Sequence, residues 1–298
     1  MGLLANVDKS ILDIKFKHGF KPEYMLEMKG VEVLKKLINL SYMELMMRQL
    51  KLSFYNFEEK RFYFLSNLIE DSAEIEEENA KMSRFNKAAQ FNNNLVNGYL
   101  HPTLRLMRLF KEGNMCMPIS IYYSAQGNNL KPFMKMESSL TVLPELYLFQ
   151  PTEMETLEKF INETQLPFKE PYMNLAIENF ELSYQVLNLD IRFLLLMMSL
   201  EALFNRGQPE LKYTISRNSA VLLGRNTKDS NIIFEDMKRL YDMRSRIIHA
   251  DKSNIIGKED LSKLYSYVRK AIIKINGLDI DKDELFILLN SKGFGEMN

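Results

Sequence analysis

The sequence predicts a mainly α fold, in which a mostly helical N-terminal region with a small β insert precedes a C-terminal helical bundle. Three observations predict it. The 298 residues include only 12 glycines and 9 prolines, so long stretches run without a helix breaker. Apolar residues recur at three- and four-residue intervals, as they do on one face of a helix. Hydrophobic residues make up 46% of the chain, which is ample for a core. Between residues 113 and 150 this helical spacing is interrupted by residues typical of strands and turns.

The N-terminal region is expected to contain one long helix and a hairpin. Residues 31–52 follow the apolar spacing of an amphipathic or largely buried helix. Farther along, residues 117–123 alternate partly between apolar and polar, and residues 140–149 are rich in strand-forming residues. Gly127-Asn-Asn marks a turn between them. We therefore expect a hairpin or a small sheet within residues 113–150.

A boundary between two domains is expected near residue 165. Thr152-Glu-Met-Glu155 matches a capping box that opens a short helix ending near Gln165. Two prolines in the segment 166–171 stop that helix, so we divide the chain into domains 1–165 and 166–298. In the second domain the apolar spacing predicts helices at about 172–187, 189–205, 210–223, 229–250, 257–276 and 281–290.

Composition gives little information on partners. Lys plus Arg and Asp plus Glu both number 39, so affinity for RNA would require a local basic patch. Residues 206–252 contain ten lysines or arginines against six aspartates or glutamates, a modest patch of net charge +4 that is compatible with RNA. The chain has no Walker loop, no dinucleotide fingerprint and no His-Glu-x-x-His motif. No cofactor and no metal are expected.

A cytoplasmic location without a membrane partner is expected. The single cysteine, Cys116, excludes an intramolecular disulfide and a cysteine-based zinc site, which fits a reducing compartment. The segment Met1–Asp8 lacks the basic region and the apolar run of a secretory signal. The longest apolar run, residues 193–200, is far shorter than the roughly 20 residues that cross a bilayer.

The candidate chemistry lies in Arg244-Ser-Arg-Ile-Ile-His249, which holds one of only three histidines. A histidine can take or give the proton of a ribose 2′-hydroxyl, and an arginine can stabilise the charge that develops on phosphorus. On an ideal helix, residues five apart point about 140° away from each other, so Arg244 and His249 of one copy do not converge. Either the helix is irregular here, or two copies assemble the site about a two-fold axis.

Four further residues are candidates for a supporting role, namely Ser245, Arg246, Asp242 and Glu201. Arg246 lies about 60° from His249 on a helix and is the closer phosphate contact. Asp242 shares that face and could orient the imidazole or pair with Arg246. Glu201 interrupts an apolar helix, and a buried carboxylate there would need Arg244 or Arg246 as its partner. The alternative to a functional site is that Asp242, Arg246 and His249 form a solvent-exposed stripe with one weak ion pair, and that Glu201 lies at the surface of the bundle.

The segment 240–250, together with Leu200–Phe204 and Glu210–Thr214, resembles the ApeA-like branch of the HEPN superfamily, whose mark is Arg, four to six residues, then His. The match covers about residues 170–275. The resemblance implies an antiparallel helical bundle, a dimer with a shared cleft and, in many members, metal-independent ribonuclease activity in phage defence, toxin or CRISPR-associated systems. Many active members carry Asn, Asp or His directly after the motif arginine, where this chain has Ser245.

Two functions follow from these residues and from the resemblance. The first is a metal-independent endoribonuclease with catalytic Arg244 and His249, which would leave 2′,3′-cyclic phosphate and 5′-hydroxyl ends. Its partners would be RNA, a second copy of the chain, and a regulatory protein or nucleotide trigger, with residues 1–165 as a sensor, regulator or dimerisation element. The second is a catalytically silent HEPN-type module that binds a nucleotide or a protein, which Ser245 favours. A purely structural helical dimer is the remaining alternative.

Overall fold

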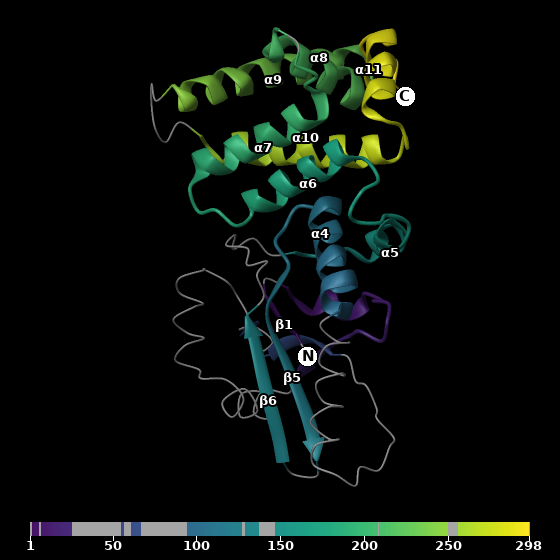
Figure 1. The fold of residues 1–298 in the computed structure, drawn as a ribbon, viewed down its shortest axis with the longest axis vertical. Coiled ribbons are helices and arrows are strands. Elements are labelled where there is room, and N and C mark those ends of the chain that lie inside the picture. Colours follow the sequence, from purple (N-terminus) through teal and green to yellow (C-terminus); the bar gives the residue numbers. More distant parts are fainter. Residues whose placement is uncertain are drawn as a thin grey trace. The chain divides into compact units, whose positions relative to one another are not determined.

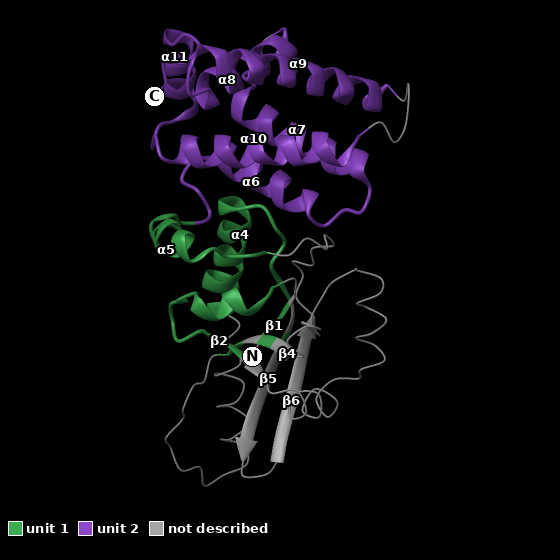
Figure 2. Ribbon diagram, turned by 180° about the vertical axis from the view of Figure 1, so that it is seen from behind, with its two compact units in different colours: residues 1–165 green, residues 166–298 purple. Residues whose placement is uncertain are grey.

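The computed structural model describes residues 2–5, 7–25, 55–56, 61–66, 94–126, 129–136, 147–207, 209–249 and 256–297. The chain divides into two compact units, residues 1–165 and 166–298, coloured separately in Figure 2. The prediction of a mainly helical chain with a small β component is confirmed. Among these described residues, no helix combines the length and the apolar character needed to cross a membrane.

The first unit contains a six-stranded antiparallel sheet with the order β2-β4-β1-β5-β6, in which β3 pairs with β4. Figure 1 labels β1, β5 and β6 of this sheet. Its strands are β1 (Gly2–Ala5), β2 (Lys21–Met25), β3 (Tyr55–Asn56), β4 (Arg61–Ser66), β5 (Cys116–Gln126) and β6 (Asn129–Met136). The predicted hairpin is present as β5 and β6, whose register runs from Ile119 opposite Met136 to Gln126 opposite Asn129.

The sheet differs from the prediction in two ways. The second strand of the hairpin is β6 rather than residues 140–149, of which only 147–149 are described, and there Tyr147 makes an isolated bridge with Val7. Strands β1 to β4 were not predicted, and the helix expected over 31–52 lies outside the described residues. Pro22 occupies β2, which among the described strands pairs with β4 alone and so lies at the sheet edge, where a residue without an N–H group is tolerated.

The described helices of the first unit are short. A π-helical turn, Val96–Leu100, leads into α4 (His101–Phe110), and a 3₁₀ turn, Pro151–Glu153, leads into α5 (Met154–Glu163). The capping contact is made by Glu153, whose carboxylate accepts the Gln150 N–H at 3.0 Å, and not by Thr152 and Glu155 as predicted. A hydrogen bond of 2.6 Å from Lys111 Nζ lowers the pKa of Glu153.

The second unit is a helical bundle, as the sequence predicts. Its helices are α6 (Pro171–Ser183), α7 (Leu189–Phe204), α8 (Leu211–Leu223), α9 (Thr227–Ile248), α10 (Lys258–Asn276) and α11 (Lys282–Ser291). The largest difference from the predicted ranges is the end of α6, at Ser183 instead of residue 187. Six predicted helices are therefore found within the described part of this unit.

Helix α7 lies at the centre of the bundle and contacts α6, α8, α9 and α10 (Figure 1). Its buried side chains include Phe193, Leu196 and Leu200, which explains why its sequence is apolar on nearly every side. The turn from α8 into α9 is tight, because a Cβ atom on Gly224 would lie 2.0 Å from Ser230 Oγ. This close approach fixes where α9 begins against α8.

Candidate functional site

Helix α9 carries the whole Arg-x4-His motif. The side chain of Asn226 caps its first turn by accepting the Asp229 N–H at 2.9 Å, which satisfies one of the donors left free at a helix start. The helix continues to Ile248, and His249 is its C-cap, with an N–H that donates to the Ser245 carbonyl at 3.0 Å. Because the α-helix is regular across the motif, helix irregularity does not bring Arg244 and His249 together.

Arg244 is turned toward α7, next to the buried face of α9. The buried side chains of Leu240 and Met243 define that face. Arg244 Nη2 lies 3.1 Å from Glu201 Oε1, so Glu201 takes one of the two arginines expected as its partner. The Arg244 guanidinium also lies 5.5 Å from the centre of the Tyr241 ring, within the range of a cation–π contact.

The Glu201–Arg244 pair is partly withdrawn from water. The two side chains are 18% and 26% exposed, respectively. Glu201 Oε1 has no hydrogen-bond partner among the described residues, so its contact with Arg244 is an ion pair without hydrogen-bond geometry. Desolvation raises the pKa of Glu201, and the charge of Arg244 offsets only part of that rise. Desolvation raises the pKa of Tyr241 as well, and Arg244 again opposes it.

This raised pKa predicts how Glu201 contributes to stability. A carboxyl whose folded-state pKa lies above its unfolded value, about 4.5, binds its proton more tightly when folded, so wild type loses stability as the pH rises through the interval between the two values. Glu201→Gln removes this titration. We expect the variant to match wild type within about 1 kcal/mol at pH 7, and to become relatively less stable as the pH is lowered toward 4.5.

Urea unfolding of both chains at several pH values measures this difference. Glu178→Gln is the matched control, because Glu178 is exposed on α6. The difference in free energy of unfolding between this variant and wild type should stay constant across the same pH interval. A wild-type chain that gains stability over Glu201→Gln as the pH rises would show that the attraction of Arg244 outweighs desolvation.

Arg246 and His249 occupy the solvent face of α9. Both side chains are exposed, and neither makes a hydrogen bond or an ion pair with another residue that the structure describes. Three residues apart, they lie about 60° from each other around the helix. His249 and Arg246 therefore share the solvent face of the helix, whereas Arg244 is turned toward α7.

Asp242 has a different partner from the two that the sequence suggested. Both of its carboxylate oxygens accept from Lys212 Nζ of α8 at 2.7 Å, so it pairs with neither Arg246 nor the His249 imidazole. Both groups of this bridge are exposed, which limits its contribution to about 1 kcal/mol or less. Ser245 is half-exposed and contributes its backbone carbonyl to the C-cap of α9.

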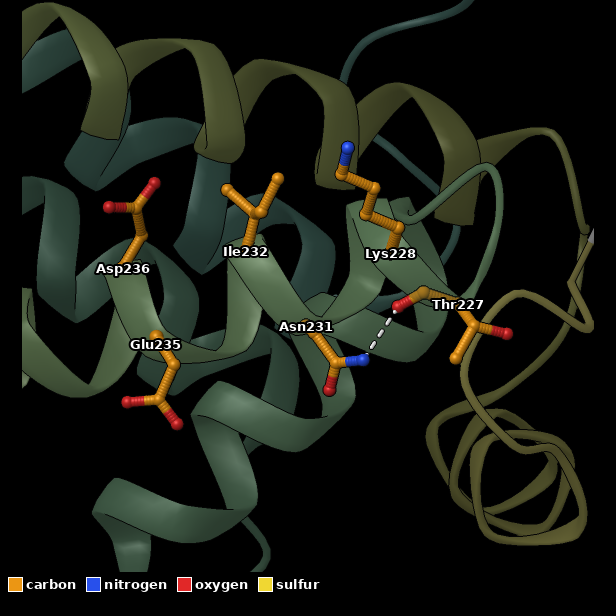
Figure 3. Close-up of a pocket in the computed structure, with 6 residues that line it drawn as sticks. All are labelled: Thr227, Lys228, Asn231, Ile232, Glu235 and Asp236. Carbon is orange, nitrogen blue, oxygen red and sulfur yellow. Dashed lines mark hydrogen bonds between the residues drawn. The ribbon is translucent and has the colours of Figure 1, made fainter.

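An open depression of about 780 Å³ lies on the first half of α9. It is lined by Thr227, Lys228, Asn231, Ile232, Glu235 and Asp236, and Figure 3 shows Lys228, Ile232 and Asp236 on one side of the helix. Asp236 already accepts hydrogen bonds from Lys263 Nζ at 3.0 Å and from Tyr267 Oη at 2.8 Å. About 20 Å of helix separates Asp236 from His249, so the depression is distinct from the motif.

Sequence reasoning missed two residues near the motif. Tyr241 was detectable in principle, because it precedes Arg244 by three positions and side chains at that spacing meet on a helix. Lys212 gave no such signal, since its contact with Asp242 depends on how α8 packs against α9.

Within the described ranges, no group of three or more His, Cys, Asp or Glu side chains is placed to hold a metal ion. Comparison with known proteins gives no match to any protein-family model, curated protein or solved structure.

Proposed function

We propose that the second unit is a metal-independent endoribonuclease whose active site forms at the C-terminal end of α9. The observation that carries this proposal is the exposure of Arg246 and His249, three residues apart at the end of α9, where both are available to a phosphodiester. The resemblance of the motif to HEPN ribonucleases supports the same chemistry.

The proposed reaction needs one proton acceptor, one proton donor and a fixed positive charge. His249 removes the proton from a ribose 2′-hydroxyl, whose oxygen attacks the adjacent phosphorus while an arginine stabilises the negative charge that builds on the phosphoryl oxygens. The bond to the 5′-oxygen then breaks, and that oxygen takes a proton from a protonated histidine. The products are a 2′,3′-cyclic phosphate and a 5′-hydroxyl.

A homodimer would complete this site. Arg244 faces Glu201 and so is directed away from the imidazole of its own chain. Met198, one turn before Glu201, and Ile248, one turn after Arg244, are 47% and 48% exposed. A second copy that covers these apolar side chains about a two-fold axis would bring Arg244 toward His249 of the partner subunit.

The cellular role that fits this proposal is phage defence or a toxin system in the cytoplasm, with residues 1–165 as the sensor or regulator that responds to a protein or nucleotide trigger. This role rests on the motif resemblance. A catalytically silent binding module is the second candidate, and a specific observation favours it: Arg244 is engaged by Glu201 rather than free. Ser245 after the motif arginine points in the same direction.

RNA cleavage by the purified chain is expected to persist in excess EDTA, because a histidine and arginines supply both the proton transfers and the charge stabilisation. The 5′-hydroxyl ends should accept phosphate from polynucleotide kinase without prior dephosphorylation. A parallel His249→Ala preparation excludes a contaminating nuclease. Activity that chelation abolishes and magnesium restores would contradict the proposal, and RNA binding without any cleavage would favour the silent module.

A further inference from the structure

Tyr213 is an exposed aromatic side chain in the first turn of α8. Its exposed fraction is 54%, and it is the only aromatic residue among the exposed large hydrophobic side chains in the part of the chain that the structure describes. Packing within the bundle does not account for this ring, because more than half of its surface lies outside the core. An exposed ring is a platform on which a planar group can stack.

One aromatic neighbour contacts the Tyr213 ring. The Phe234 ring of α9 meets it edge to face, with centroids 5.9 Å apart and an angle of 82° between the planes. Phe234 also contacts Phe294, with centroids 5.7 Å apart, and Lys238 Nζ lies 5.1 Å from the centre of the Phe234 ring. A contact that restricts the rotation of the Tyr213 ring reduces the conformational entropy that the ring loses when a ligand stacks on it.

Two lysines lie near this ring, and each is paired with a carboxylate, Lys212 with Asp242 and Lys238 with Glu235 at 3.1 Å. Lys212 precedes Tyr213, and its ammonium group bonds Asp242, which lies about 10 Å along α9 from His249. Lys238 lies about 16 Å from His249 along the same helix. Asp242 and Lys238 are each within about 20° of the direction of His249 around the helix axis. The strip of Tyr213, Lys212 and Lys238, together with the carboxylates that pair with the two lysines, thus lies along the face of α9 that ends at His249.

We infer that Tyr213 forms a nucleobase-stacking subsite for single-stranded RNA, with Lys212 and Lys238 as contacts to the flanking phosphates; this inference rests on the proposed ribonuclease function. Aromatic rings accept any base, because every base offers a π face, whereas lysines attract the backbone. The ligand must be single-stranded, since a base within a duplex is stacked between its neighbours.

The test measures binding of a short fluorescent oligoribonucleotide to the full chain carrying His249→Ala, which does not cut the probe in the proposed mechanism. Adding Tyr213→Ala should weaken binding by about tenfold to a hundredfold, whereas Tyr213→Phe should keep it. Tyr213→Leu keeps an apolar side chain against Phe234 without a ring, and should lose affinity as alanine does. Ile287→Ala, which removes an exposed apolar side chain on α11, is the matched control and should have no effect.

The outcomes separate this inference from the proposed function. If wild type never cleaves RNA but RNA affinity still depends on Tyr213, the subsite is supported and the ribonuclease proposal is contradicted. Cleavage by wild type with an unchanged KM in Tyr213→Ala and Tyr213→Leu overturns the subsite alone. Equal affinity of the alanine, leucine and parent chains for the probe, or tighter binding of the same sequence as a duplex, overturns it as well. A surface that binds a protein through Tyr213 but no RNA would also overturn it.

Discussion

Replacement of His249 by alanine is expected to abolish RNA cleavage, with a fall in rate of about 10²- to 10⁴-fold, because the imidazole is the proposed proton acceptor and donor. The side chain is exposed at the end of α9 and makes no hydrogen bond or ion pair with another described residue. Its removal therefore costs no packing, and the melting temperature should stay at the wild-type value. Cleavage of a fluorescent oligoribonucleotide and a thermal melt measure both quantities.

His18→Ala provides the matched control, since it removes an exposed histidine from the first unit, and its cleavage rate should equal that of wild type. A His249→Ala chain that cuts as fast as wild type, with an unchanged melting temperature, would place the chemistry elsewhere. An inactive but unfolded variant would instead assign the residue a structural role, which its exposure at the C-cap argues against.

The bundle could be predicted from the sequence because each of its helices is long enough to show a helical period. Residues that stop or start a helix lie at several ends, as Pro171 does at the first position of α6 and Gly224 does after α8. Most strands of the first unit have two to six residues, which is too short for alternation to be distinguished from chance. Their pairing is also non-local, since Gly2 lies opposite Ser120.

The candidate site was predictable only where local rules decide the outcome. An acidic residue in an apolar helix needs a cationic partner, and Glu201 has Arg244. Helical spacing also placed Arg246 and His249 on one face. The partner of Asp242 depends on the packing of α8 against α9, which no spacing within α9 reveals, so Lys212 was missed. Tyr213 was missed for the same reason, because its contact with Phe234 joins two helices.

Arg244 makes the strongest case for a shared site. It is turned toward Glu201, whereas His249 stands on the solvent face, so a reaction that needs both residues needs two chains. Mixing an inactive Arg244→Ala chain with an inactive His249→Ala chain is therefore expected to restore activity. Random pairing makes half of the dimers hybrid, and each hybrid holds one intact Arg–His pair, so about a quarter of the wild-type rate should return.

Two features of this experiment need controls. Loss of Arg244 leaves Glu201 without its cation, so Arg244→Lys, which keeps the charge but not the planar fork, should be mixed in parallel to show that any effect is not a loss of folding. Ile248→Glu places a charge in the apolar surface beside the motif and should reduce the mass measured by light scattering from that of a dimer to that of a monomer, with loss of cleavage.

A site that requires all four side chains would stay inactive on mixing, and the scattering result then decides. If each pair of chains shares its cleft, dilution below the dimer dissociation constant should make the cleavage rate fall with the square of protein concentration, because the active species is the pair. A monomeric mass at micromolar concentration, in a preparation that cleaves RNA at a rate linear in protein concentration, would show that one chain suffices. Arg246 and His249 of a single α9 would then be the complete site.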